Sequence, residues 1–448
     1  MIKHTILSLA AALVCLTAGC SGAKTKSPEQ QLAYQITNDT LMHKVDSMAR
    51  EVVKGGFNAG DGYGEVWIRD YNTFIELAME VMPDSTIQDN LITFFHFQGK
   101  TGDIVDGFID INKADLNNKG GYKYRLSDTE PRYAAHKNTV ETDHEASLVQ
   151  AVWRYVNKSG NKSFLQKQIN GQTVEKRLEM ALEFLMNERL DKTYGLIWGA
   201  TTADWGDVQP EHPWGVELDE NSHLAIDIYD NAFFIIALNH FIELTDRPEA
   251  KERWAKVRDD IKVNTRKYLW DEAKQKFIPH IYLKDSPFPS DFDENSIYYH
   301  GGTAMAIEAG LLSKEEIAAA NATMVANVKA SGAPTIGLTL YPPYPEGFFQ
   351  NKGMYPYGYQ NGGDWTWFGA RMIQQLIRNG FVEEAYKEAL PMFQRVVKNN
   401  GFYEWYAVDG KPSGSGTFRG EAGVLFKVIE EFRTWASIQN GNVNSKDK

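Results

Sequence analysis

Residues 223–269 read HLAIDIYDNAFFIIALNHFIELTDRPEAKERWAKVRDDIKVNTRKYL. Apolar residues recur at spacings of three and four, which is the period of an α-helix, and the alternation typical of a β-strand is missing. The stretch therefore predicts two helices, 223–245 and 248–269, joined by a short turn. Two helices joined in this way form an antiparallel helical hairpin.

The rest of the chain repeats this arrangement. The same period predicts further helices over 30–54, 70–82, 86–98, 142–157, 173–188, 300–311, 314–330, 364–379, 381–399 and 420–438. Long links rich in Gly, Pro, Asp and aromatic residues separate some of the pairs, at 99–141, 189–222, 270–299, 331–363 and 400–419. Long links are uncommon in a compact domain unless they have a function. About twelve helices in six hairpins, with the long loops gathered at one end, predict an all-α fold, the (α/α)6 toroid.

An open helical solenoid is the competing architecture. Such arrays repeat at a fixed length, and no fixed period is found here, which favours the closed ring. No Pro/Ser-rich linker divides the body, so we expect one domain over 31–438 and a polar tail over 439–448.

The first twenty residues have the layout of an export signal. Lys3 and His4 precede an apolar run that is too short to span a bilayer as a stable helix. The ending Leu16-Thr17-Ala18-Gly19-Cys20 resembles the lipobox of bacterial lipoproteins, which implies a signal peptide over 1–19 and a lipid on Cys20. The alternative is an ordinary signal peptide with an incidental cysteine. Residues 20–30 are polar and are predicted to be a flexible tether.

The composition limits the classes of function. Removal of the signal leaves Cys20 as the sole cysteine, so disulfides, thiolate metal sites and a cysteine nucleophile are excluded. The net charge of −12 and the lack of a basic block argue against a nucleic-acid partner. Aromatic residues make up 12% of the chain, and many lie beside Gly, Asp and Asn in the long links. An aromatic ring beside a carboxylate is the chemistry of a sugar site, because the ring stacks on the sugar while the acid binds its hydroxyls.

Two acidic segments stand out in the first half of the chain. Trp67-Ile68-Arg69-Asp70 precedes a helix. The guanidinium of Arg69 supplies a planar fork of donors and Asp70 a charged acceptor, and such a pair can bind two adjacent hydroxyls of a sugar. Asp70 as a helix cap is the structural alternative. Trp198 is followed by Ala203-Asp204-Trp205-Gly206-Asp207, in which a desolvated Asp204 would stay protonated and serve as a general acid. Turn formation is the alternative there, and Asp207, Asp219 and Glu220 are rival acids.

Two further segments lie near the C-terminus. Residues 359–367 read YQNGGDWTW and offer Asn361 and Trp365, whereas Asp364 is also a good helix cap. Glu404 and Trp405 lie in the last long link, where a carboxylate among aromatic residues could activate water. In addition, Asp143 begins the helix at 142–157 and either lines the same pocket or caps that helix. The ten histidines show no metal-binding spacing, and the acidic loop at 291–295 is best explained as a solvated turn, so neither a metal nor a cofactor is expected.

These segments together resemble one superfamily. Residues 67–70 resemble the Trp-x-Arg-Asp motif of glucoamylases and the Arg-Asp-Thr-Phe stretch of glycogen-debranching amylo-1,6-glucosidases. Residues 359–365 resemble their Tyr-His-Asn-Gly-x-x-Trp segment, with Gln360 in place of the His. Residues 404–406 are similar to the segment that carries the base in glucoamylase-like enzymes, and 203–207 to the acid-bearing loop of the debranching and disaccharide-phosphorylase relatives. The paired Glu of glucoamylases is missing from that loop, and Thr417-Phe418-Arg419-Gly420-Glu421-Ala422 replaces a Trp-Ser pattern, which leaves the sugar open.

The resemblance implies a six-hairpin barrel and an exo-acting glycoside hydrolase that inverts the anomeric centre. Asp204 is then the acid and Glu404 the base, and the Arg69–Asp70 pair grips the terminal sugar, with an α-glucoside favoured. The predicted substrate-binding set is Trp67, Arg69, Asp70, Asp143, Trp198, Trp205, Asn361, Trp365 and Trp405. The alternatives are a glycoside phosphorylase, a sugar epimerase or a non-catalytic glycan-binding protein. We expect a monomer with an oligosaccharide substrate, held by its lipid to the outer membrane, because Ser21 rather than Asp follows Cys20.

Overall fold

A computed structural model describes residues 26–117, 123–213 and 216–441, and the predicted signal peptide, Cys20 and most of the polar tail lie outside this part of the chain. The described residues form thirteen α-helices. They are α1 (Pro28–Thr37), α2 (Thr40–Lys54), α3 (Ile68–Val81), α4 (Asp84–His96), α5 (His144–Ser159), α6 (Val174–Glu188), α7 (Ile228–Leu244), α8 (Pro248–Leu269), α9 (His300–Glu308), α10 (Lys314–Ser331), α11 (Thr366–Arg378), α12 (Val382–Asn399) and α13 (Arg419–Gln439).

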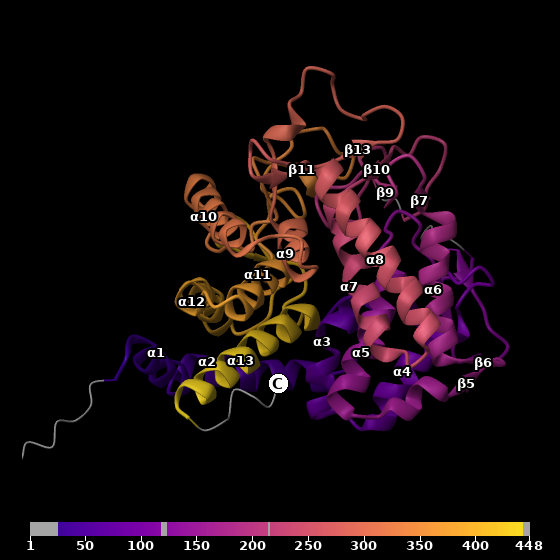
Figure 1. The fold of residues 1–448 in the computed structure, drawn as a ribbon, viewed down its shortest axis with the longest axis horizontal. Helices are drawn as coiled ribbons and strands as arrows, with labels where there is room; N and C mark the ends of the chain where they lie inside the picture. The colour runs from indigo at the N-terminus through magenta and orange to yellow at the C-terminus, as the bar shows by residue number, and fades with distance from the viewer. Residues whose placement is uncertain (1–25, 118–122, 214–215, 442–448) are drawn as a thin grey trace, which may run out of the picture.

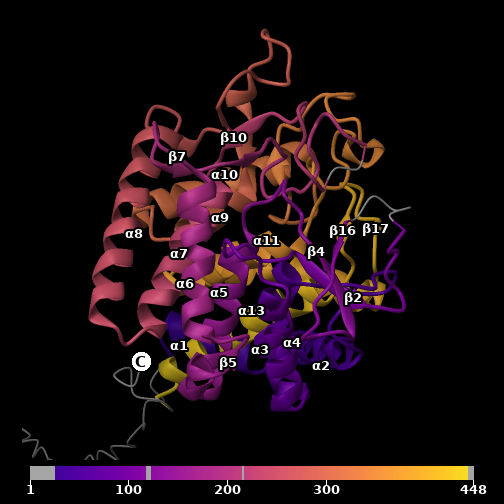
Figure 2. The same ribbon diagram turned by 90° about the vertical axis from the view of Figure 1, so that its right-hand side faces the viewer.

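Six of these helices form a closed inner ring. The helices α3, α5, α7, α9, α11 and α13 contact one another in that order, and α13 contacts α3 in turn. The helices α2, α4, α6, α8, α10 and α12 each precede one inner helix and pack outside the ring, and α1 packs on α13 (Figures 1 and 2). The predicted all-α toroid of six hairpins is therefore confirmed.

The difference between inner and outer helices is visible in the quoted stretch 223–269. Helix α7 has an apolar sequence and is buried almost all round, as an inner helix must be when neighbours cover every face. Helix α8 is mostly charged and buries a stripe that includes Trp254, Ile261 and Leu269. The turn between them lies at Thr245–Arg247, as the sequence predicts.

The predicted helix 30–54 is two helices. The chain breaks at Asn38 and Asp39, and the Asp39 carboxylate accepts hydrogen bonds from the backbone of Leu41 (2.7 Å) and Met42 (3.2 Å), which begins α2 anew. Helix α1 starts at Pro28, inside the predicted tether 20–30, because Ser27 forms a capping box with Gln30.

Short strands, which the sequence did not predict, lie in the links between the helices. They are β1 (Val66–Trp67), β2 (Gly107–Asp110), β3 (Tyr124–Arg125), β4 (Tyr133–His136), β5 (Gln168–Ile169), β6 (Gln172–Thr173), β7 (Leu190–Asp191), β8 (Leu196–Ile197), β9 (Gly199–Ala200), β10 (Leu224–Ile226), β11 (Trp270–Asp271), β12 (Lys276–Phe277), β13 (Ile281–Tyr282), β14 (Tyr298–Tyr299), β15 (Leu340–Tyr341), β16 (Trp405–Tyr406) and β17 (Pro412–Ser413). Antiparallel pairing gives one four-stranded sheet, β1-β2-β4-β3, a three-stranded sheet, β13-β10-β9, and several two-stranded pairs. Strands of two to four residues carry too little alternation to be recognised in a sequence.

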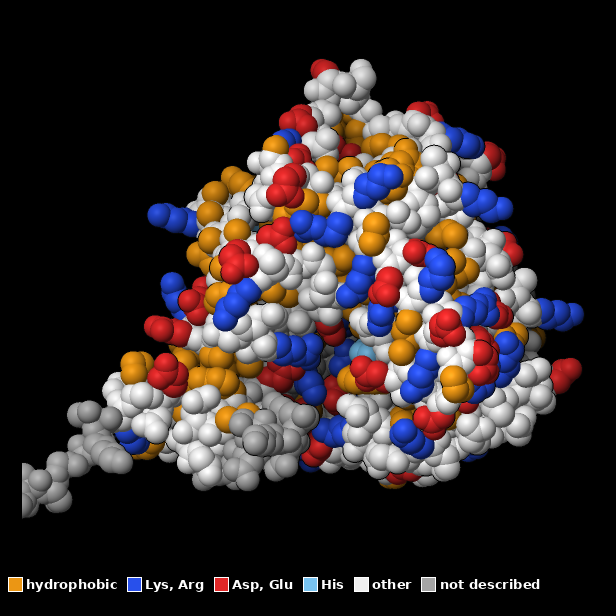
Figure 3. All heavy atoms as spheres, viewed as in Figure 1, with side chains coloured by type: hydrophobic (Ala, Val, Ile, Leu, Met, Phe, Trp, Pro, Cys, Tyr) orange, Lys and Arg blue, Asp and Glu red, His pale blue; other side chains and the backbone are white. Residues whose placement is uncertain are grey.

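The long loops all precede an inner helix. The six inner helices therefore begin at one end of the ring, where these loops lie, and the short links such as Thr245–Arg247 lie at the other end (Figure 2). Acidic and basic side chains are interspersed over the face in Figure 3. Within the described ranges, no helix is both long enough and apolar enough to cross a membrane.

Candidate active site

Three carboxyl groups lie near one another at the end of the ring where the inner helices begin. Asp70 lies in the first turn of α3, Asp207 in the loop before α7 and Glu404 in the loop before α13. The negative charges of Asp207 and Glu404 both raise the pKa of Asp70, and that of Asp207 raises the pKa of Glu404. Loops that are distant in sequence thus bring the three groups into one site.

Glu404 is buried and held through one oxygen. Its Oε2 accepts hydrogen bonds from the Tyr63 hydroxyl (2.8 Å) and from the backbone of Ser415 (3.2 Å), whereas no described residue donates to Oε1. Gly414 has a φ of +69°, and a Cβ there would come within 2.3 Å of Glu404 Oε2, so this close approach requires glycine. Burial raises the pKa of Glu404, and the charge of Asp207 adds to the rise.

Asp70 is as deeply buried as Glu404, and no described residue forms a hydrogen bond with its Oδ1. Burial raises the pKa of Asp70 to about 8, while the positive charge of Arg69 opposes the rise. The predicted alternative, a helix cap, does not apply, because α3 begins at Ile68 and Asp70 lies inside its first turn. Asp70 is a buried carboxyl that faces the other two acids.

The Arg69 guanidinium lies near Asp70 and Asp207, but its hydrogen bonds and ion pairs go to other groups of the protein. Its Nε donates to Asp143 Oδ2 (2.7 Å), its Nη2 forms an ion pair with Glu141, and its Nη1 donates to the Trp205 carbonyl (3.4 Å). Asp143 is wholly buried and also accepts from the Tyr229 hydroxyl (2.7 Å). The structure therefore places Arg69 and Asp143 in a structural network beneath the site.

Glu141, Asp143 and His144 lie close enough to hold a metal ion, with their ligand atoms within 4.8 Å of one another. Arg69 already supplies a positive charge to both carboxylates, and His144 Nε2 lies 3.0 Å from Glu141 Oε2. Burial lowers the pKa of His144, with Lys137 and Arg69 adding to the effect. The charges of this cluster are compensated by ion pairs, whereas Asp143 Oδ1 has no hydrogen-bond partner among the described residues.

The structure gives Asp204, the predicted acid, a different contact. Its two carboxylate oxygens accept hydrogen bonds from the backbone of Gly301 (2.7 Å) and Gly302 (2.8 Å), in the first turn of α9. Backbone amides at a helix start are groups that a carboxylate commonly satisfies. Burial raises the pKa of Asp204, as predicted, while the two amides lower it. Both oxygens are thus engaged within the protein.

Asp207, one of the rival acids, is half-buried in the same loop and faces Glu404. Its Oδ1 accepts a hydrogen bond from Gln360 Nε2 (2.7 Å). Its charge also raises the pKa values of Tyr63 and Tyr359, which places these two side chains around the same space. The other rivals, Asp219 and Glu220, are exposed on the loop surface, where Asp219 pairs with His212 (3.2 Å).

Aromatic rings surround the carboxyl groups. Tyr63 packs edge-on against Trp67 (4.9 Å between ring centroids), and Tyr359 against Trp365 (5.3 Å) and Trp405 (6.3 Å). Trp205 is almost wholly buried and packs against Trp365 (4.8 Å). Four of the predicted tryptophans therefore belong to one aromatic assembly, in which Trp67 is half-buried and the other three are buried.

Two predicted binding residues have other roles. Trp198 lies under the Arg189 guanidinium, 4.5 Å from its ring centroid, and its carbonyl accepts from Thr142. Asn361 is wholly buried, and its amide bonds to Tyr344 and Met354, so it holds the loop. Asp364 is not a helix cap either, because its carboxylate binds Thr335 and forms an ion pair with Arg395 (2.8 Å).

Tyr63 and the contact of Gln360 with Asp207 were not predicted from the sequence. Tyr63 lies next to Gly64 in the link before α3, and an aromatic residue beside glycine was the available signal. Glu294, in the acidic loop 291–295, accepts hydrogen bonds from Tyr282 and Tyr344 and so holds two loops together, whereas Asp291 and Asp293 are exposed.

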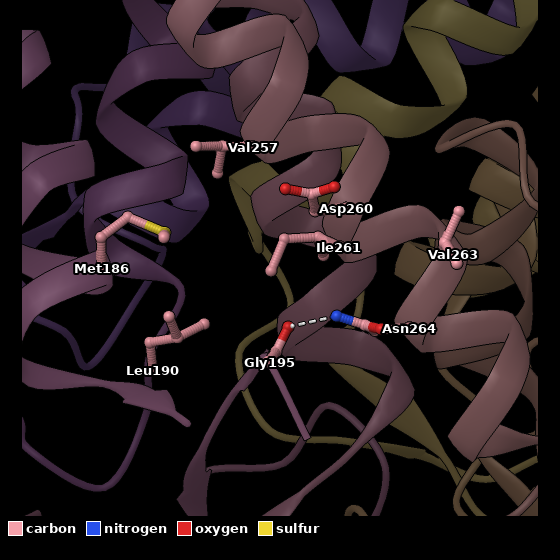
Figure 4. Close-up of a pocket in the computed structure, with 8 residues that line it drawn as sticks. All are labelled: Met186, Leu190, Gly195, Val257, Asp260, Ile261, Val263 and Asn264. Carbon is pink, nitrogen blue, oxygen red and sulfur yellow. Dashed lines mark hydrogen bonds between the residues drawn. The ribbon is translucent and has the colours of Figure 1, made fainter. Parts of the chain in front are cut away.

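A separate hollow lies outside the ring, between α6 and α8 (Figure 4). Its lining includes Met186, Leu190, Val257 and Ile261. None of the carboxyl groups described above borders it, so it is not part of this site.

No protein-family model matches the sequence, and no curated protein matches it either. Solved structures do match the fold. The GH63 mannosylglycerate hydrolase from Thermus thermophilus, in complex with glucose, has a TM-score of 0.60 and 15% identity over 86% of this chain and 99% of that one. The rhamnosidase from Klebsiella oxytoca with rhamnose bound has a TM-score of 0.58 and 12% identity over 88% of this chain, which spans 64% of that one. The chain therefore shares the fold of these two proteins. A GH78 family rhamnosidase of Bacillus sp. GL1 shares this six-hairpin fold, with a TM-score of 0.56 and 13% identity over 87% of this chain and 34% of that one.

Proposed function

We propose that the protein is a glycoside hydrolase that uses Asp207 as its general acid and Glu404 as its general base. The observation that carries the proposal is the pair itself, two carboxyls that distant loops bring near each other, with Glu404 held by Tyr63 and Asp207 held by Gln360. Asp207 replaces Asp204, the acid predicted from the sequence, because both oxygens of Asp204 cap α9.

We propose that the reaction inverts the anomeric centre. In the proposed step, Asp207 protonates the glycosidic oxygen as the C–O bond breaks, and water attacks the anomeric carbon while Glu404 takes its proton. Tyr63 and Ser415 occupy Oε2 of Glu404, which leaves Oε1 to accept from the water. Inverting enzymes hold their carboxyls roughly 6.5–9.5 Å apart so that this water fits.

The charges favour a neutral sugar. Asp70, Asp207 and Glu404 face the site, and the nearby guanidinium of Arg69 is paired with two other carboxylates. An anionic sugar would meet uncompensated repulsion there. A buried carboxyl at Asp70 can bind the hydroxyls of a terminal sugar, and we therefore propose exo action on an oligosaccharide, with an α-glucoside as the first substrate to test.

The phosphorylase alternative requires a site for phosphate where the water would stand. Among the described residues, the charge that shifts the pKa of Glu404 is that of Asp207, an anion, and no cation contributes. A second anion at this point is unfavourable, which supports water as the nucleophile. An epimerase or a glycan-binding protein without catalysis remains an outcome of the test below.

The test is purified protein with a panel of oligosaccharides and aryl glycosides, with the anomer of the first product read by NMR. We expect release of a terminal sugar with inverted configuration and no dependence on phosphate. Glu404→Gln and Asp207→Asn should each lower kcat by on the order of 10²-fold or more, whereas Asp204→Asn, the matched control from the same loop, should keep the leaving-group dependence of the wild type. Binding without turnover, or near-normal turnover by Asp207→Asn, would overturn the proposal.

A further inference from the structure

We propose that Gln360 is a positioning residue that fixes Asp207 and places the acidic proton on Asp207 Oδ2. This inference rests on the proposed function of Asp207 as the acid. It concerns the position at which the sequence departs from the Tyr-His-Asn-Gly pattern of the families that it resembles.

Gln360 holds Asp207 at two points with one side-chain amide. Its Nε2 donates to Asp207 Oδ1 (2.7 Å), and its Oε1 accepts from the Asp207 backbone N–H (3.2 Å). Gln360 is almost wholly buried, and its own carbonyl accepts from Thr339 (2.9 Å), which fixes it in turn. This paired contact restrains both the backbone and the carboxyl of Asp207.

The backbone around this contact is arranged to allow it. A Cβ on Gly206 would come within 2.8 Å of Gln360 Oε1, so the amide approaches the loop only because residue 206 is glycine. Tyr359, directly before Gln360, has a φ of +34°, a strained conformation for a non-glycine residue. Strain of this kind persists where surrounding contacts hold it in place.

The chemistry of the amide selects one oxygen of Asp207. An amide N–H can only donate, so Oδ1 must accept, and the proton of the acid form is left to Oδ2. No described residue forms a hydrogen bond with Oδ2. A histidine could donate or accept and could carry charge, whereas glutamine is neutral at every pH and donates in one direction.

The charged and titratable groups that face Asp207 from the neighbouring elements are Arg69, Asp70, Glu404, Tyr63 and Tyr359. Gln360 adds a contact without adding a charge. A change at residue 360 therefore acts on the acid directly, while the charges around it stay the same.

The first test uses Gln360→Met, which keeps the length of the side chain but removes the donor. With alkyl glycosides, which need an acid, kcat/KM should fall by on the order of tenfold to a hundredfold, and with 2,4-dinitrophenyl glycosides it should stay near the wild type. The ratio of the two rates in one variant does not depend on the fraction of folded protein. An equal loss on both substrates would show a structural role and overturn the inference.

The second test uses Gln360→Glu, which puts a carboxyl against the acid. Two carboxyls in contact hold a shared proton more tightly, so the basic limb of the pH profile of kcat/KM should move to higher pH. An unmoved limb in a folded variant would contradict the proposed contact. Asp207→Asn distinguishes failure of the proposed function from failure of the inference on Gln360. If Asp207→Asn loses the same activity on both substrates, the proposed function fails. If Asp207→Asn loses activity mainly on alkyl glycosides while Gln360→Met loses the same activity on both, the inference on Gln360 alone fails.

Discussion

Carboxyl groups of the same type have different roles here because they have different partners. Asp204 and Glu404 are both buried, and burial raises the pKa of each. Asp204 gives both oxygens to backbone amides, whereas Glu404 receives its hydrogen bonds on one oxygen. The free oxygen, rather than the degree of burial, distinguishes the group that can act on a substrate.

Tyr63→Phe tests this reasoning at Glu404. The hydrogen bond from Tyr63 lowers the pKa of Glu404, so its removal should raise that pKa and move the acidic limb of the pH profile to higher pH. We also expect kcat to fall by on the order of tenfold to a hundredfold, since one hydrogen bond to a charged group stabilises by roughly 1.5–3 kcal/mol. The pH profile of kcat/KM is the measurement, and Tyr403→Phe in the same loop as Glu404 is the control. A lower rate with an unmoved limb would rule out a direct effect on Glu404.

Individual residues also set the limit of what the sequence could predict about the site. Glu404, Asp70 and the tryptophans stand in motifs, and the structure brings Asp70, Asp207 and Glu404 together around one space. The contacts of Asp204 and Arg69 with the protein itself could not be predicted, because each partner lies on a distant element. Those of Asn361 lie within its own loop, whose irregular path has no sequence period to predict it.

At the level of helices, a buried carboxyl on one element accepts hydrogen bonds from the first turn of a neighbouring helix. Asp204 caps α9, and Glu421 on α13 accepts a hydrogen bond from the backbone of Trp367 (2.9 Å), in the first turn of α11. Buried carboxyls thus satisfy the helix ends that surround the site. The helices themselves could be predicted from their period, whereas these links between them could not.

Glu421→Gln should change how stability depends on pH. Burial raises the pKa of Glu421 to about 8, against roughly 4.3 in the unfolded chain. Between these values the folded state holds a proton that the unfolded state has lost, so the free energy of unfolding falls as the pH rises, by up to ~1.4 kcal/mol per pH unit. The variant keeps an acceptor for Trp367 and should lose less stability from pH 5 to 8. Asp70 contributes equally to the pH dependence of the wild type and the variant. The free energy of unfolding, measured in urea at each pH, should therefore differ in slope between the two proteins, and parallel curves would contradict the raised pKa of Glu421.

Gly423→Ala should weaken the contact between α13 and α3. A Cβ on Gly423 would come within 2.5 Å of the Phe74 backbone, which cannot move aside as a side chain can. We expect a loss of about 1–3 kcal/mol in the free energy of unfolding, measured by chemical denaturation, since overpacking costs this much. Thr434→Ala, on the exposed face of the same helix, should change stability little. Equal stability of Gly423→Ala and the wild type would mean that the two helices can separate without cost.

At the level of the whole molecule, the number of helices and the alternation of short and long links were sufficient to predict the ring. Two features of the structure were not predicted. The break at Asp39 depends on one capping side chain, and each short strand depends on a few paired residues. The order of the loops around the ring follows from the closed contacts of α3 to α13, and it explains how residues far apart in the sequence share one site.

The N-terminal helix lies at the end of the ring away from the long loops (Figures 1 and 2). We propose that Cys20 carries a lipid, which would hold the chain to a membrane. Cys20→Ser should release the protein from the membrane fraction without a change in kcat on a soluble substrate, as measured by fractionation and assay. Wild-type protein found in the soluble fraction would contradict the anchor.

The closure of the ring by α13 has one more consequence. A closed ring of hairpins has no first member, and α1 and α13, which carry the two ends of the described chain, pack against each other. A circular permutant that joins these ends and opens the chain at Thr245–Arg247, far from the carboxyl groups, should therefore fold to the same barrel. The active site then depends on the order of the hairpins around the ring and not on which hairpin comes first in the chain.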